Sequence, residues 1–144
     1  MKLFQIEEPD GAPLDPDGPG AAVGIDIGGS EGAVVAISVG GNAEILPDSD
    51  GARRLAAPGL VAGDRFDVKA LADLLLTLRG RAERQLARPV THAVIAASPL
   101  DEHALQQAAE AAGLVVLRLV ARAGSGDDAV TAAASLAEEL APVP

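Results

Sequence analysis

The chain has 144 residues, of which 49% are hydrophobic, and this length and composition suit one domain with its own core. Its formal net charge of −10 repels phosphate backbones and its only aromatic residues are two Phe, so we expect no nucleic-acid partner. The absence of Cys excludes disulfides and thiolate metal sites. No apolar run is long enough to span a membrane, so we expect a cytoplasmic protein without a membrane partner.

Residues 1–20 have a different composition from the rest. Repeated Pro and Gly interrupt any regular structure there, and acidic residues stand between them. We therefore expect an extended acidic leader over 1–20 and a single folded domain over 21–144.

A glycine-rich stretch, residues 22–32, opens this domain. Its apolar residues alternate with Gly24, Asp26 and Gly28, which predicts a strand that carries one carboxylate on a face nearly free of side chains. Two further strands are predicted over 33–39 and 43–46, each after a glycine turn. The three together form an antiparallel meander.

The first hairpin has a possible chemistry. A glycine turn at Gly28, Gly29 and Ser30 would offer backbone N–H groups to a phosphate, and Asp26 could hold a hydrated Mg²⁺. The alternative is a structural hairpin whose Asp hydrogen-bonds the turn, and the spacing alone favours this alternative. The stretch is not a dinucleotide fingerprint, because its glycines do not follow G-x-G-x-x-G and a strand follows in place of a helix.

After an irregular segment over 51–64, three helices alternate with two strands. Asp67 is the predicted N-cap of the first helix, which ends before Pro89 and whose arginines we expect on a solvated surface. Strands are predicted over 90–97 and 114–121, and we expect His92 to be structural. The second helix runs from Ser98 to Gly113, and the third covers 129–140 behind a cap at Asp127 or Asp128.

The resulting order is β-β-β-α-β-α-β-α. It predicts a single three-layer α/β domain with a mixed sheet and right-handed crossovers.

This order, opened by Gly24-Ile25-Asp26-Ile27-Gly28, resembles the first lobe of the ribonuclease H-like, actin-like ATPase fold shared by actin, Hsp70 chaperones and sugar kinases. The stretches 90–95 (VTHAVI) and 111–119 (AAGLVVLRL) are similar to an Hsp70 strand and to a later helix end with its strand. The leader 3–9 and the run 43–53 are similar to the Hsp70 of bacterial iron–sulfur cluster assembly, the HscA type.

The resemblance implies roles for several residues. Asp26 matches the carboxylate that organises the hydrated Mg²⁺, and Gly28, Gly29 and Ser30 match the first phosphate loop for ATP or ADP. Glu31, however, places a negative charge where the phosphates would lie.

Other parts of the family's active site have no counterpart. The insert with the catalytic lysine is missing, and Lys69 belongs to the following helix. The acid that polarises the attacking water either becomes Arg122 or has no equivalent. We expect the second lobe and the substrate-binding domain to be absent as well, and phosphoryl transfer depends on such positioned groups. We therefore expect no significant ATPase activity and at most weak ATP binding.

The resemblance thus implies a truncated, non-catalytic Hsp70-like protein in protein folding or iron–sulfur cluster assembly. Its expected partners are a J-domain co-chaperone or cluster-assembly proteins. Three alternatives stay open: a half-site for ATP completed by self-association or by another chain, a sugar-kinase-related fragment, and a decayed fragment without a biochemical role.

Overall fold

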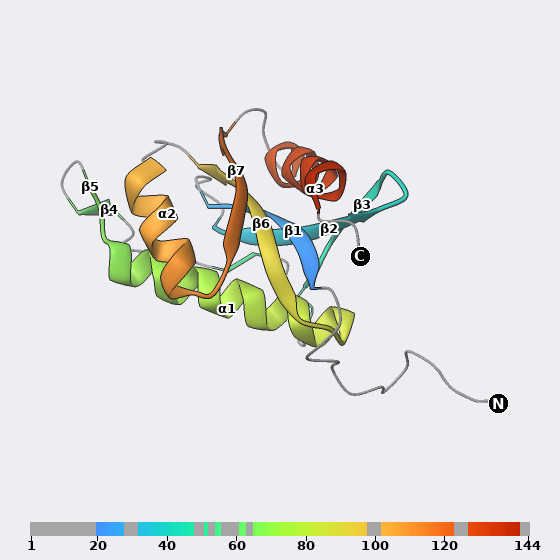
Figure 1. The fold of residues 1–144 in the computed structure, drawn as a ribbon, viewed down its shortest axis with the longest axis horizontal. Coiled ribbons are helices and arrows are strands. Elements are labelled where there is room, and N and C mark those ends of the chain that lie inside the picture. Colours follow the sequence, from blue (N-terminus) through green and yellow to red (C-terminus); the bar gives the residue numbers. More distant parts are fainter. Residues whose placement is uncertain are drawn as a thin grey trace.

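A computed structural model describes residues 20–27, 32–47, 51, 54–55, 61–62, 65–97, 102–122 and 127–141. These residues form a single α/β domain in which three helices pack around a five-stranded mixed sheet (Figure 1). The elements are β1 (Ala21–Asp26), β2 (Val34–Val39), β3 (Asn42–Ile45), β4 (Val61–Ala62), β5 (Arg65–Phe66), α1 (Val68–Leu86), β6 (Val90–Ala97), α2 (Glu102–Ala111), β7 (Val115–Ala121) and α3 (Asp128–Leu140). The predicted three-layer α/β domain is confirmed.

The sheet has the order β3-β2-β1-β6-β7. Strands β1, β2 and β3 form the predicted antiparallel meander, and β6 and β7 extend it in parallel to β1. The central strand β1 is therefore bordered by the antiparallel and the parallel part. Because β1, β6 and β7 are parallel, their carboxyl ends lie at one edge of the sheet, which is where ligands bind in open α/β sheets.

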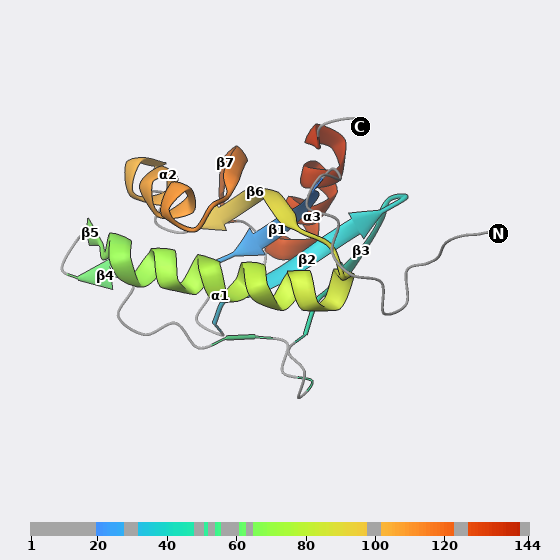
Figure 2. The same ribbon diagram turned by 60° about the horizontal axis from the view of Figure 1, so that its bottom comes forward.

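The two faces of the sheet are covered unequally. Helices α1 and α2 pack on one face, and the main core forms there around the largest buried side chains: Ile25, Leu71, Leu75, Leu78, Ile95 and Leu105. Among the described elements, only helix α3 packs on the other face, mostly over β1 and β2 (Figures 1 and 2). Its core is built from alanines and valines in two smaller clusters.

Helix α1 begins at the predicted cap. The side chain of Asp67 accepts a hydrogen bond from the backbone N–H of Ala70 at 3.2 Å, which satisfies one of the helix's first donors. The helix ends at Leu86: the N–H of the C-cap Ala87 still donates to the carbonyl of Glu83, and the left-handed φ of 54° at Ala87 then turns the chain out of the helix. The expectation of a solvated arginine face is wrong for Arg81, which is 3% exposed. Its position lies between the buried Leu78 and Ala82, so the helix's apolar stripe is wider than the leucines alone suggest.

The segment predicted as irregular before α1 contains a short antiparallel ribbon of β4 and β5, separate from the main sheet. In addition, Leu55 forms an isolated antiparallel bridge with Ala33, just before β2. Residues 1–19 of the predicted leader and the predicted start of the second helix at Ser98 lie outside the described residues. No helix within the described ranges has the length and apolar character needed to cross a membrane.

Candidate functional site

Asp26 is the last residue of β1, at the carboxyl edge of the sheet. Its side chain is fully buried, on the face that α3 covers. Gly24 precedes it on this face, and the helix lies so close there that a Cβ on Gly24 would stand 2.6 Å from the carbonyl carbon of Ala133. The face that the sequence left nearly free of side chains is thus the contact surface for α3.

Arg122 holds the carboxylate of Asp26. Its Nε lies 2.9 Å from Oδ1 and 3.1 Å from Oδ2, and its side chain is 15% exposed. Arg122 directly follows β7, and its backbone N–H donates to the carbonyl of Ala97 at 2.9 Å. The hydrogen bonding between β6 and β7 therefore fixes the position of the Arg122 backbone. A charge-assisted pair in this protected position is short and directional.

This geometry does not fit the expected Mg²⁺ role of Asp26. A hydrated Mg²⁺ needs carboxylate oxygens that face water or phosphate, whereas both oxygens of Asp26 are buried and within hydrogen-bonding distance of a guanidinium. Across the described ranges, no three His, Asp or Glu side chains gather as a metal site. A cation would have to displace Arg122 first.

The predicted phosphate loop, Gly28, Gly29 and Ser30, lies outside the described residues, as does Glu31. The last described residue before this loop is Ile27, whose N–H donates to the carbonyl of Ala96 at 3.0 Å. Asp26 is therefore the one residue of the predicted site whose surroundings are described.

A second arginine ties the start of α3 to this edge of the sheet. Arg54 donates to the carbonyl of Gly32 at 3.1 Å and to Oδ1 of Asp127 at 2.8 Å. Asp127 is the residue before α3, yet its side chain makes no capping hydrogen bond to the helix. Of the two caps that the sequence allows, Asp127 and Asp128, the structure places Asp127 at the N-cap position but uses its carboxylate for a long-range ion pair.

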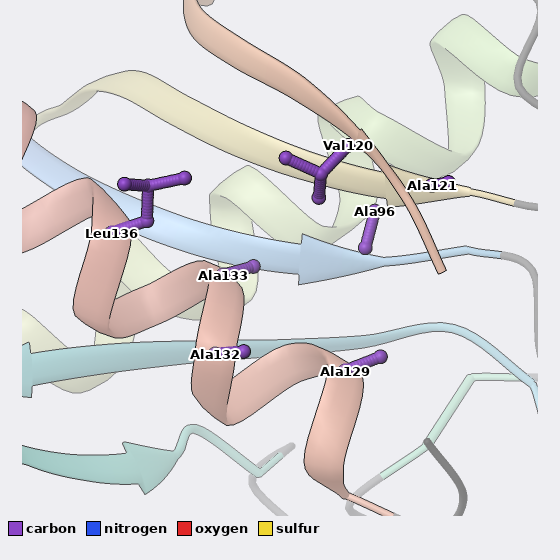
Figure 3. A pocket seen from close by; sticks show the side chains of 7 residues that line it. All are labelled: Ala96, Val120, Ala121, Ala129, Ala132, Ala133 and Leu136. Carbon is purple, nitrogen blue, oxygen red and sulfur yellow. The ribbon is translucent and has the colours of Figure 1, made fainter. Parts of the chain in front are cut away.

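An apolar pocket of about 190 Å³ lies between α3 and the ends of β6 and β7 (Figure 3). Ala96, the register partner of Asp26 on β6, forms part of its wall. The remaining lining residues come from the end of β7 and from α3: Val120, Ala121, Ala129, Ala132, Ala133 and Leu136. No polar side chain of the described residues lines it, so within this part of the chain the pocket offers apolar contact.

At the far end of α3, Glu138 reaches the turn between β2 and β3. Its carboxylate accepts hydrogen bonds from Ser38 Oγ at 2.8 Å and from the backbone N–H groups of Gly40 and Gly41 at 2.6 and 3.0 Å. These three donors favour the charged form and lower the pKa of Glu138 below its ordinary value of 4.5. This contact was not predicted, because nothing in the local sequence pattern links positions 38–41 to position 138.

His92, expected to be structural, has Nδ1 2.7 Å from the hydroxyl oxygen of Thr91. It lies in the amino-terminal half of β6, whereas Asp26 pairs with Ala96 near the other end of that strand. The structure therefore does not bring His92 to the candidate site.

No protein-family model matches this chain, and no match to a curated protein was found. The Hsp70 resemblance consequently depends on the sequence motifs alone and remains a prediction. What the described residues establish is an α/β domain whose central strand ends in a carboxylate neutralised by an arginine.

Proposed function

We propose that this chain is a non-catalytic, Hsp70-like protein that acts in protein folding or iron–sulfur cluster assembly in the cytoplasm. It binds ATP weakly at most and works through a protein partner, for which a J-domain co-chaperone or a cluster-assembly protein is the leading candidate. The observation that carries the non-catalytic part is the buried pair of Asp26 and Arg122. The chaperone assignment depends on the sequence resemblance.

The Asp26–Arg122 pair argues against catalysis for a reason of charge. A phosphoryl-transfer site needs a carboxylate that directs a cation onto the phosphates. In this chain that negative charge is already neutralised by a residue of the same domain. By the resemblance, the acid that activates water is either replaced by Arg122 or has no equivalent, so this chain lacks that charge in both cases.

Calorimetry tests this proposal. Mg-ATP and Mg-ADP are titrated into the purified protein, and into the same protein mixed with a J-domain co-chaperone or cluster-assembly proteins. We expect little or no heat from nucleotide alone and no hydrolysis. Magnesium-dependent turnover that Asp26→Asn abolishes would contradict the proposal. Nucleotide binding that appears only at high protein concentration would favour the alternative of a half-site completed by self-association.

Binding to the two partner classes is measured separately, with purified components on a biosensor surface. Binding to either one supports the chaperone assignment, and binding to neither contradicts it. Asp26→Asn serves as a matched variant here, because a non-catalytic role predicts that partner binding does not need this carboxylate as long as the variant folds.

A further inference from the structure

Strand β7 ends the sheet on its parallel side, because among the described strands only β6 pairs with it (Figure 1). Its sequence, VVLRLVA, is apolar at every position except Arg118. Within the described structure none of its residues is buried, and Val115 is 55% exposed. Such a continuous apolar run is typical of a strand inside a sheet, so the open edge of β7 is a surface that a further strand would cover.

The other edge of the sheet differs in the expected way. Strand β3 has only four residues, and two of them, Asn42 and Glu44, are polar and exposed. Short, polar edge strands discourage further pairing. The described residues give β7 no such protection beyond Arg118 and one irregularity in its pairing with β6, and from Arg118 to Ala121 the pairing is regular. The part of β7 that is open to a new strand is therefore its second half.

The leader contains a segment of matching length. Residues 3–6, Leu-Phe-Gln-Ile, have the alternation and the residue types of a short strand, and Pro9 limits it. The amino ends of β1, β6 and β7 lie at one edge of the sheet, and a strand added beyond β7 lies three strand spacings, about 14 Å, from β1. Residues 7–19 span up to about 40 Å when extended, so they can bridge this distance. Because this connection joins the strands at the same edge, the added strand runs antiparallel to β7.

An antiparallel register that pairs residues 3–6 with Arg118–Ala121 places Phe4 opposite Val120. Val120 is the register partner of Ala96, and both line the pocket of Figure 3. Phe4 then lies on the side of α3, where its ring covers apolar surface at the mouth of this pocket. The backbone supplies hydrogen bonds to β7, and the aromatic and β-branched pair stabilises the register.

Charge around this edge is nearly balanced and does not by itself select the occupant. Arg118 and Arg122 are at β7, whereas the neighbouring helices have exposed acids, Glu110 on α2 and Glu139 on α3. In the register above, Glu8 becomes a diagonal neighbour of Arg118, which favours this pairing slightly. Backbone hydrogen bonding and apolar contact therefore carry the selection.

Two other occupants fit less well. A two-fold pairing of β7 with the β7 of a second copy, about its middle residue, places Arg118 opposite Arg118, and like charges directly opposite are destabilising. A strand of another protein has to compete with a segment that is tethered to the same domain, for which the effective concentration is about millimolar.

We infer that residues 3–6 add to the sheet as a further strand, antiparallel to β7, and cover its open edge. This inference goes beyond the proposed function and does not depend on it. It gives the leader a structural role, since the leader then closes the side of the sheet that the described elements leave open.

A spin label tests where this segment lies. The chain has no Cys, so Gln5→Cys provides a unique attachment site for a nitroxide. In NMR spectra of the full chain, we expect this label to broaden the amide signals of β7, with Leu119, which the register places opposite position 5, among the most affected. The signals of β3 should stay sharp. Ala12→Cys, labelled in the same way, is the matched control and should not produce this pattern.

Broadening centred on β3, or spread evenly over the domain, would overturn the inference. A mixture of isotope-labelled wild type with spin-labelled, isotope-free Gln5→Cys separates the two sources of the strand. Broadening of β7 in this mixture would mean that a second copy supplies the strand, which contradicts the inference.

Amide hydrogen exchange tests the cover of β7 without a label. Phe4→Ser removes the ring that packs on Val120, and we expect the β7 amides to exchange at least about tenfold faster than in the wild type. Leu14→Ser, the matched control, removes another apolar side chain of the leader and should leave exchange unchanged. The amides of the central strand β1 should keep their protection in both variants, which shows that the domain stays folded.

Equal exchange of the β7 amides in the wild type and in Phe4→Ser would overturn the inference. So would protection of β7 that appears only after a J-domain co-chaperone or a cluster-assembly protein is added, because the partner would then cover the edge. Failure of the proposed function is seen in other measurements, the nucleotide titrations and the partner binding, and leaves the spin-label result unchanged.

Discussion

Asp26 and Arg122 form a largely buried ion pair, with side chains 0% and 15% exposed. A carboxylate removed from water is tolerated only when an opposite charge and hydrogen bonds compensate it. The pair joins the ends of β1 and β7, two strands that β6 separates in the sheet. It therefore fixes the carboxyl edge across three strands.

Replacing Arg122 with Gln should cost about 3–5 kcal/mol of unfolding free energy, because the buried carboxylate of Asp26 loses its guanidinium. Urea unfolding at pH 7 measures this cost. The double variant Asp26→Asn/Arg122→Gln should recover part of the loss, because it buries no charge at this position.

The matched control for this experiment is Lys69→Gln. Lys69 lies 3.3 Å from Asp73, but the two side chains are 87% and 68% exposed. Such a surface pair contributes at most about 0.5 kcal/mol. If Arg122→Gln changed stability as little as Lys69→Gln does, the buried pair would not have the structural role described.

Glu138 predicts a pH dependence. Its pKa is lowered in the folded protein by Ser38, Gly41 and Gly40, so the charged carboxylate stabilises the fold. This contribution is fully present above the ordinary pKa of 4.5 and is lost as pH falls through the lower folded value. The difference in stability between wild type and Glu138→Gln should therefore be constant near neutrality and shrink below about pH 4.5. A difference that grows on acidification would contradict the assignment.

At the scale of elements, the contact between β1 and α3 depends on Gly24. A Cβ at this position would stand 2.6 Å from the backbone carbonyl carbon of Ala133, and a helix backbone cannot rotate away as a side chain can. Gly24→Ala should therefore cost at least about 3 kcal/mol, the upper end of overpacking penalties. Chemical denaturation measures the cost.

Gly80 offers the opposite case. It lies inside α1, where the nearest atom to an added Cβ is Arg84 Nη1 at 3.7 Å. Gly80→Ala should raise stability by about 0.5–1 kcal/mol, because Ala has the higher helix propensity and restricts the unfolded chain. If Gly24→Ala lowered stability no more than Gly80→Ala does, α3 would have to be able to shift away from β1.

The elements themselves were largely predictable from the sequence, because each depends on local patterns. The alternation around Asp26 predicted β1, the cap at Asp67 predicted the start of α1, and the apolar run after Pro89 predicted β6. The burial of Arg81 and the β4–β5 ribbon were not predicted, since apolar spacing and propensity do not report tertiary contacts.

The site was less predictable for the same reason. The two ends of the Asp26–Arg122 pair are 96 positions apart, and those of the Ser38–Glu138 contact are 100 apart. The alternation predicted that Asp26 lies on the glycine-rich face of its strand, but it also allowed the carboxylate to bind a hydrated Mg²⁺. Only the register of β6 and β7 shows that Arg122 reaches it.

At the scale of the whole molecule, the net charge of −10 opposes the compact state through self-repulsion. Added salt screens this repulsion, since the Debye length falls from about 30 Å at 0.01 M to about 8 Å at 0.15 M. We therefore expect the thermal midpoint to rise with NaCl over this range. Differential scanning calorimetry measures it, and a midpoint that falls with salt would mean that the ion pairs outweigh the repulsion.

The packing of α3 on β1 and β2 also determines when the protein can fold during its synthesis. Residues 21–39 leave the ribosome long before residues 128–140, yet Val34 and Ala36 are buried against that last helix. Until it emerges, one side of the first hairpin has no native layer to bury it. The nascent chain therefore exposes this apolar surface through most of translation, and the native domain closes only once its final helix is made.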